Sequence, residues 1–354
     1  MTTVYLHVGM PKCASTALQS FLHRNDGLHR SEGLCYPMTC REDTGYFSHR
    51  PLHNLQPVEI PTAIEKIARE AAAADCDRIL ISSEEFVNSL WDCEITGHIV
   101  DALNVRFGVE NVRIMILFRN PFPFVESVYA QFLKGGMFRT PGEAFMKSRA
   151  NDIQAFAMNF RMRHGFDFFS YSAFVERLRF HAPFNPFDML SIERADWDGA
   201  DILDVLCRRL GITRGNPEVA ANERYSETAL HLLHHARRTH GFQKTKARRG
   251  IIAALFPNQD GLFSKLIHVH GDLFDQIQDS AERDRRYFQR HSSEPNDHLF
   301  RTPNGYEKSR DQKDQLIVPT WQLKLAERIV TRGEMSMAFA QKMKSIMQRK
   351  AEQA

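Results

Sequence analysis

The sequence has almost no excess of charge of either sign, which excludes one broad class of function. It contains 46 Lys and Arg residues against 43 Asp and Glu residues, a net charge of +3 over 354 residues. Proteins that bind nucleic acid through bulk charge carry a clear basic excess. We therefore expect no nucleic-acid partner.

Long apolar runs are missing as well. No stretch approaches the roughly 18 consecutive apolar residues that indicate a transmembrane helix, so we expect no integral membrane segment. The first residues, MTTVYLHVGMPK, do not show the basic segment and apolar run of a secretory signal.

Paired cysteines are also absent from the sequence. None of the six forms a Cys-x-x-Cys pair; they are Cys13, Cys35, Cys40, Cys76, Cys93 and Cys207. This scatter matches neither a disulfide framework nor a zinc site, and it is typical of thiols in a reducing compartment. We predict a cytoplasmic protein that holds no metal.

The sequence does contain a regular alternation of strand and helix patterns. Runs rich in β-branched and apolar residues are followed by runs with helical periodicity. The predicted strands cover residues 3–8, 78–82, 112–118 and 187–192, and the predicted helices cover 15–22, 62–74, 95–107, 122–134 and 200–210. This order is typical of βαβ units, so we predict a three-layer α/β/α fold with a mainly parallel sheet.

Two parts of the chain depart from this alternation. Residues 26–61 show no periodicity and are predicted to form a long ordered loop, a type that is usually functional. From about residue 225 the pattern is mostly helical, and a helix over 319–350 has Met residues suited to core packing or to a homo-oligomer contact. We therefore divide the chain into an α/β core, 1–225, and a helical extension packed on it, 226–354, which could together form one domain.

The strongest local motif lies between the first strand and the first helix. Residues 9–16 read GMPKCAST, and a helix N-terminus in this position directs backbone N–H groups toward an anion. Lys12 adds a cation, while Ser15 and Thr16 add hydroxyl donors. The spacing differs from that of a Walker A loop, because no glycine precedes Lys12.

A second candidate phosphate site follows the third predicted strand. Arg119 ends this strand, and Ser127 lies eight positions later in the next predicted helix. A guanidinium is a planar fork suited to phosphate oxygens. Ligands of open α/β sheets bind at the carboxyl ends of the strands, where both motifs are predicted to lie.

These residues resemble the sulfotransferase family that uses 3′-phosphoadenosine 5′-phosphosulfate (PAPS). The family's 5′-phosphosulfate loop, Gly-x-Pro-Lys-Thr-Gly-Thr-Thr, is matched here at Gly9, Pro11, Lys12 and Thr16 and differs at positions 13–15. The resemblance covers residues 3–230. It implies a P-loop-like fold, PAPS as sulfuryl donor without a required metal, and transfer to a hydroxyl of a glycan, glycolipid or small metabolite.

The resemblance also implies the donor-binding residues. Those for the 5′-phosphosulfate are Pro11, Lys12, Cys13, Ala14, Ser15, Thr16 and Ala17, and those for the 3′-phosphate are Arg119 and Ser127. Arg248, Arg249 and Gly250 match a late basic-Gly motif of some members, although a basic run of this kind is more often a solvated face. Lys12 would also stabilise the charge that develops on the bridging oxygen.

A hydroxyl acceptor needs a general base, and several residues are candidates. Glu84 and Glu85 follow the second predicted strand, where the family places its base; alternation points them to opposite sides, and we prefer Glu84. His49 and His53, in the 26–61 segment, are the alternatives. The pair His231 and His235 has metal-ligand spacing but is predicted to be part of a helix face.

Two other functions remain open at this point. One is an ATP-dependent kinase or phosphotransferase, which would use Glu84 or Glu85 as a magnesium ligand. The other is a non-catalytic nucleotide-binding scaffold that kept the loop without the base. The first would bind its nucleotide with magnesium, whereas a sulfotransferase should bind its donor in a chelator.

Overall fold

The computed structural model describes residues 2–88, 93–135, 153–216, 225–257, 269–309, 318–332 and 335–353. The chain divides into two compact units. The first comprises Met1–Phe124, Phe168–Ala221 and Ile277–Thr302, and the second comprises Val125–Asp167, Asn222–Gln276 and Pro303–Ala354. Each unit is thus built from three separate stretches of the chain.

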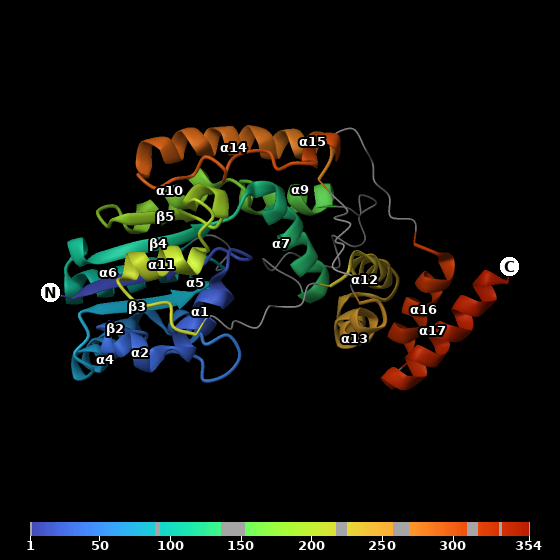
Figure 1. Cartoon of the computed structure of the whole chain (residues 1–354), viewed down its shortest axis with the longest axis horizontal. Helices are drawn as coiled ribbons and strands as arrows, with labels where there is room; N and C mark the ends of the chain where they lie inside the picture. The colour runs from blue at the N-terminus through green and yellow to red at the C-terminus, as the bar shows by residue number, and fades with distance from the viewer. Residues whose placement is uncertain are drawn as a thin grey trace. The chain divides into compact units, whose positions relative to one another are not determined.

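A five-stranded parallel sheet forms the centre of the first unit (Figure 1). Its order is β2-β3-β1-β4-β5, and the strands are β1 (Thr3–Val8), β2 (Leu34–Cys35), β3 (Arg78–Ser83), β4 (Val112–Phe118) and β5 (Phe187–Ser191). Nearly every residue of these strands is buried, as expected for a parallel sheet with both faces covered. All four predicted strands are confirmed, and β2 is an additional edge strand.

Helices of the first unit connect and cover these strands, consistent with the predicted three-layer α/β/α fold. They are α1 (Ser15–Arg24), α2 (Asp26–Ser31), α3 (Arg50–His53), α4 (Ile60–Ala73), α5 (Glu85–Asn88), α6 (Glu94–Phe107), α10 (Tyr171–His181), α11 (Ile202–Leu210) and most of α14 (Gly271–His291). α6 packs on β1 and β4, and α1 packs on β3. Because all strands are parallel, their carboxyl ends lie along one edge.

Arginines hold the opposite edge of the sheet together. The Arg78 guanidinium donates to the carbonyls of Glu32, Leu210 and Gly211, at the ends of two helices. Arg113 of β4 forms a bidentate ion pair with Asp188 of β5, at 2.9 and 2.7 Å. These charged groups are therefore used to join neighbouring elements.

The expectation of a loop over residues 26–61 is wrong. This segment contains α2, β2, α3 and a short 3-10 helix, Pro57–Glu59. A two-residue strand and four- to six-residue helices are too short to produce a visible periodicity. Long-range contacts order the segment instead, and these are not encoded in its local pattern.

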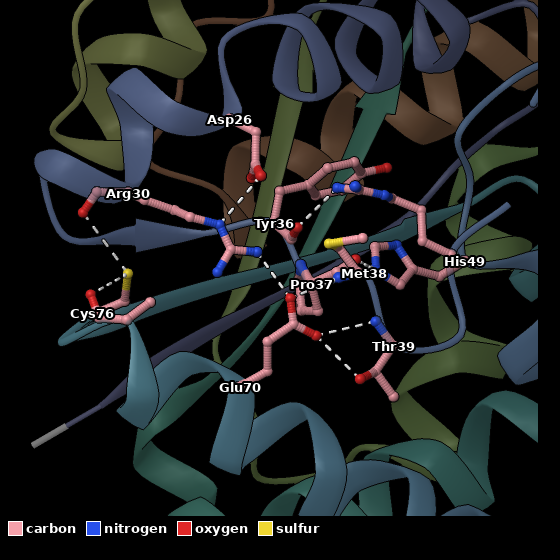
Figure 2. Close-up of polar contacts among 11 residues, drawn as sticks. Asp26, Arg30, Tyr36, Pro37, Met38, Thr39, His49, Glu70 and Cys76 are labelled. Carbon is pink, nitrogen blue, oxygen red and sulfur yellow. Dashed lines mark hydrogen bonds and ion pairs between the residues drawn. The ribbon is translucent and has the colours of Figure 1, made fainter. Parts of the chain in front are cut away.

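Glu70 of α4 provides the main contacts of this kind. Its carboxylate accepts the Met38 N–H at 2.8 Å, the Thr39 N–H and hydroxyl at 3.0 Å each, and the Arg30 guanidinium at 2.7 Å (Figure 2). Burial alone would raise the pKa of Glu70, but these hydrogen bonds hold it below its usual value. The turn at residues 37–39 is therefore fixed to α4.

The second unit is helical in its described part. Its helices are most of α7 (Pro121–Gly135), α9 (Ile153–His164), α12 (Glu227–His240), α13 (Phe242–Leu255), α15 (Tyr306–Ser309), α16 (Thr320–Thr331) and α17 (Met337–Glu352). Side chains of α12, α13, α16 and α17 share one apolar core. His235 of α12 pairs with Glu327 of α16 at 2.8 Å, and the described residues contain no cluster of three or more metal-type ligands.

The single helix expected over residues 319–350 is wrong as well. Two helices, α16 and α17, occupy this range, and α17 begins after Ser336, whose hydroxyl accepts the Phe339 N–H at 3.3 Å. Serine before a helix is a favoured N-terminal cap, so the break has a local cause. Within the described ranges, no helix combines the length and apolarity needed to cross a bilayer.

Candidate active site

The loop between β1 and α1 leaves a helix N-terminus without a side-chain cap at the carboxyl edge of the sheet. Lys12 and Ala14 have left-handed backbone conformations, with φ of 63° and 65°, and the Cys13 N–H donates to the Met10 carbonyl at 3.3 Å. Ala14 provides no side-chain cap, and the first turn of α1 carries no acidic residue. Since the first N–H groups of a helix have no partner inside it, this end of α1 can bind an anion.

Ala14 occupies a backbone position that favours glycine, which provides a test of the loop. A left-handed conformation costs a residue with a β-carbon about 1–2 kcal/mol, and glycine avoids this cost. Glycine also increases the conformational entropy of the unfolded chain, which offsets part of the gain in stability. We expect Ala14→Gly to raise the free energy of unfolding in urea by about 0.5–1 kcal/mol. Ala17→Gly, inside α1, is the matched control and should lower it by a similar amount. Destabilisation by Ala14→Gly would contradict this loop conformation.

Glu84 follows β3 and lies directly against this loop. A β-carbon at Gly9 would come within 2.7 Å of Ser15 Oγ and 3.2 Å of Glu84 Cγ, so glycine permits the two strand ends to meet. Burial raises the pKa of Glu84 to about 7, although the Lys12 ammonium and a hydrogen bond with Ser15 act to lower it. A carboxyl group that titrates near neutrality is suited to act as a general base.

The neighbouring Glu85 occupies a different position. It begins α5, and its backbone N–H donates to Ser83 Oγ at 3.1 Å. Its charge contributes to the raised pKa of Glu84. Both predicted carboxylates thus lie at the carboxyl end of β3, and Glu84 is the one packed against Gly9 and hydrogen-bonded to Ser15.

His49 is held by the backbone of two other segments. Its Nδ1 accepts the Ser82 N–H at 3.2 Å. Its Nε2 donates to the Pro37 carbonyl at 3.1 Å (Figure 2). Burial is the main cause that lowers the pKa of His49 to about 4. The ring therefore attaches the segment after β2 to β3, and this use favours Glu84 as the base. His53 lies in α3 and is half-buried.

The residues after β4 form a turn whose backbone polar groups are bound by distant side chains. The Cys13 thiol accepts the Arg119 N–H, and the Tyr171 hydroxyl donates to the Arg119 carbonyl at 2.5 Å. The next residue, Asn120, donates its N–H to Glu193 Oε1 at 2.8 Å. Because Cys13 belongs to the β1–α1 loop, its contact brings Arg119 next to that loop.

The other residues predicted to bind the donor belong to the second unit. Ser127 lies in the second turn of α7, and α13 carries Arg248, Arg249 and Gly250. Arg249 donates to the Lys134 carbonyl at 3.1 Å, near the end of α7, where cationic side chains commonly bind the last carbonyls of a helix. Arg249 therefore has a structural contact besides its predicted role.

Sequence reasoning missed Tyr171 and Glu193 at this edge. Glu193 stands just after β5, a position equivalent to that of Glu84 and Glu85 after β3, so a systematic reading of strand ends would have found it. Tyr171 begins a helix far along the chain, and no local pattern marks its contact with Arg119.

Comparison of the chain with family models, with curated proteins and with solved structures found no match. The residues at the carboxyl edge of the sheet are therefore the basis for assigning a function. Lys12, Glu84 and Arg119 come from three different strand ends and are linked there through Ser15 and Cys13.

Proposed function

We propose that this protein is a sulfotransferase with a P-loop-like core that transfers a sulfuryl group from PAPS to a hydroxyl of a glycan, glycolipid or small metabolite. The observation that carries the proposal is the connection between two anion-binding motifs. The uncapped N-terminus of α1 and the Arg119 turn are joined by the hydrogen bond from the Arg119 N–H to the Cys13 thiol. A donor with phosphates at both its 5′ and 3′ positions needs two such motifs close together.

Each residue has a defined part in this proposal. The N–H groups of Ser15, Thr16 and Ala17 bind the 5′-phosphosulfate, with Pro11 and Ala14 shaping the loop, and Arg119 binds the 3′-phosphate. Ser127 and the segment Arg248, Arg249 and Gly250 are proposed as further 3′-phosphate contacts. Charge is stabilised by cations and N–H donors, as in the phosphoryl-transfer template, so we propose no required metal.

Glu84 and Lys12 act on the two sides of the reacting sulfur. The acceptor oxygen forms a new S–O bond while the S–O bond to the adenosine 3′,5′-bisphosphate breaks. Glu84 takes the proton of the acceptor hydroxyl, and Lys12 stabilises the charge that develops on the departing bridging oxygen. The ionised form of Glu84 is the active one, so activity should increase with pH through about 7.

A cytoplasmic location is part of the same proposal. Cys13, Cys35, Cys76 and Cys207 are buried thiols, which supports a reducing compartment. Burial also raises the pKa of the Cys13 thiol, so this residue at the site is protonated and inert at neutral pH.

Binding of 3′-phosphoadenosine 5′-phosphate, the reaction product, tests the proposal directly. We expect it to raise the melting temperature in EDTA, because a ligand at 100 times its Kd adds about 2.7 kcal/mol to the stability of the folded state. AMP and ATP should have smaller effects in the same buffer. Stabilisation by ATP with magnesium, and none by the bisphosphate, would instead indicate a phosphotransferase. Binding of the bisphosphate without turnover of any hydroxyl acceptor would indicate a scaffold.

A further inference from the structure

The Tyr171 hydroxyl donates a hydrogen bond to the Arg119 carbonyl, and the Tyr171 side chain is fully buried. The distance from Tyr171 Oη to the carbonyl oxygen is 2.5 Å. The rings of Phe118 and Phe124 pack against Tyr171, with centroids 4.9 and 5.6 Å away. Burial, the main cause, keeps the pKa of Tyr171 well above its usual value, so the hydroxyl is a permanent donor.

Asp284 of α14 fixes the backbone of Tyr171 in turn. Its carboxylate accepts the Tyr171 N–H at 2.8 Å, the Ser172 N–H at 2.9 Å and the Ser172 hydroxyl at 2.5 Å. Ser170, the residue before α10, provides no side-chain cap. Asp284 therefore caps α10 from another helix and sets the position of its first residue.

These contacts form a continuous chain from α14 to the Arg119 turn. Asp284 holds the Tyr171 backbone, the Tyr171 hydroxyl holds the Arg119 carbonyl, and the Cys13 thiol holds the Arg119 N–H. With both of its backbone polar groups bound, Arg119 has a fixed base from which its guanidinium extends. A binding group held in this way loses little freedom when its ligand arrives.

We propose that Tyr171, supported by Asp284, is a positioning residue that aligns Arg119 for the 3′-phosphate of the donor. This inference rests on the proposed function. It assigns Tyr171 no contact with the donor. It predicts that removing one hydroxyl, which contacts the Arg119 carbonyl and not its guanidinium, changes selectivity for the 3′-phosphate while the rest of the donor binds as before.

The test compares two ligands that differ by this phosphate alone. Calorimetry would give the Kd of 3′-phosphoadenosine 5′-phosphate and of AMP for the wild type and for Tyr171→Phe. We expect the bisphosphate to bind about tenfold more weakly to the variant, because binding must then order the Arg119 backbone that the hydroxyl holds in the wild type, with AMP affinity unchanged. Tyr287→Phe is the matched control, because it removes a tyrosine hydroxyl that joins the same two helices, α14 and α10, through Glu176 without contacting Arg119; it should leave both constants unchanged.

A double-mutant cycle separates positioning from a general loss of stability. The Arg119→Met variant should no longer bind the bisphosphate more tightly than AMP. Adding Tyr171→Phe to this variant should then have no further effect on the ratio of the two Kd values. An unchanged ratio in Tyr171→Phe, or an equal loss for both ligands, would overturn the inference while leaving the proposed function in place. Failure of the wild type to prefer the bisphosphate would overturn both.

Asp284→Asn provides a second variant should Tyr171→Phe not fold. The amide keeps the size of the side chain and one oxygen acceptor, so α10 loses part of its cap. We expect about a threefold loss in affinity for the bisphosphate, with AMP unaffected. Equal weakening of both ligands would count against the positioning role.

Discussion

Replacing Glu84 with Gln is expected to reduce turnover by about 10²–10⁴-fold while leaving donor binding intact. Glutamine fills the same space but cannot take a proton, and the loss of a general base typically costs about 10²–10⁴-fold in rate. The bisphosphate should bind Glu84→Gln at least as well as the wild type, because a negative charge next to the anion loop is removed. Steady-state rates with PAPS and equilibrium binding of the bisphosphate measure the two effects separately.

The same substitution is expected to stabilise the protein, and the pH dependence has a definite sign. The pKa of Glu84 rises from 4.5 in the unfolded chain to about 7 in the folded one, chiefly through burial. The folded state thus favours the neutral form, so stability falls as pH rises between these values and is constant above them. Glu84→Gln, always neutral, should match the wild type below about pH 4.5 and be more stable by about 3 kcal/mol above pH 7.

Two further variants test whether the effects on turnover and on stability are specific to Glu84. Glu110→Gln, at the opposite edge of the sheet before β4, should change neither turnover nor the pH dependence of melting. Glu85→Gln tests the other carboxylate at the end of β3. Loss of turnover in Glu85→Gln, with normal turnover in Glu84→Gln, would transfer the base to Glu85 and contradict the role given to Glu84.

The sheet was predictable because its signals are local. Each buried parallel strand gives a short apolar run, and such runs marked β1, β3, β4 and β5 without any knowledge of their partners. β2 was missed because two residues cannot show a pattern. Its position depends on pairing with β3, through Leu34 and Cys35, and on the contacts that Glu70 makes with the following turn.

The candidate site was predictable to the extent that its residues stand at strand ends. Lys12, Glu84 and Arg119 all do, and topology alone brings them to one edge of the sheet. The contacts that prepare them for function are of long range: Tyr171 lies 52 residues from Arg119, and Asp284 lies 113 residues from Tyr171. No periodicity or spacing joins such pairs, so only the folded chain reveals them.

Replacing Lys12 with Met is expected to reduce turnover by about 10²–10³-fold, the effect of removing one preorganised group that stabilises developing charge. Methionine keeps the length of the side chain without its charge. The backbone at Lys12 is already left-handed, with φ of 63°, and methionine has no greater difficulty there than lysine. Lys66→Met, an exposed residue of α4, is the control and should retain full turnover.

The pH profile of Lys12→Met distinguishes a lost charge from a damaged loop. The Lys12 ammonium holds the pKa of Glu84 lower than burial alone would place it. Removing this charge should therefore move the pH at which the residual turnover reaches half its maximum upward from about 7. A variant that merely distorted the loop would also lose the hydrogen bond between Ser15 and Glu84 and the affinity for AMP. An unchanged pH profile with normal turnover would show that Lys12 is neither near Glu84 in solution nor part of the reaction. It would also contradict the proposal that Glu84 and Lys12 act on opposite sides of the reacting sulfur.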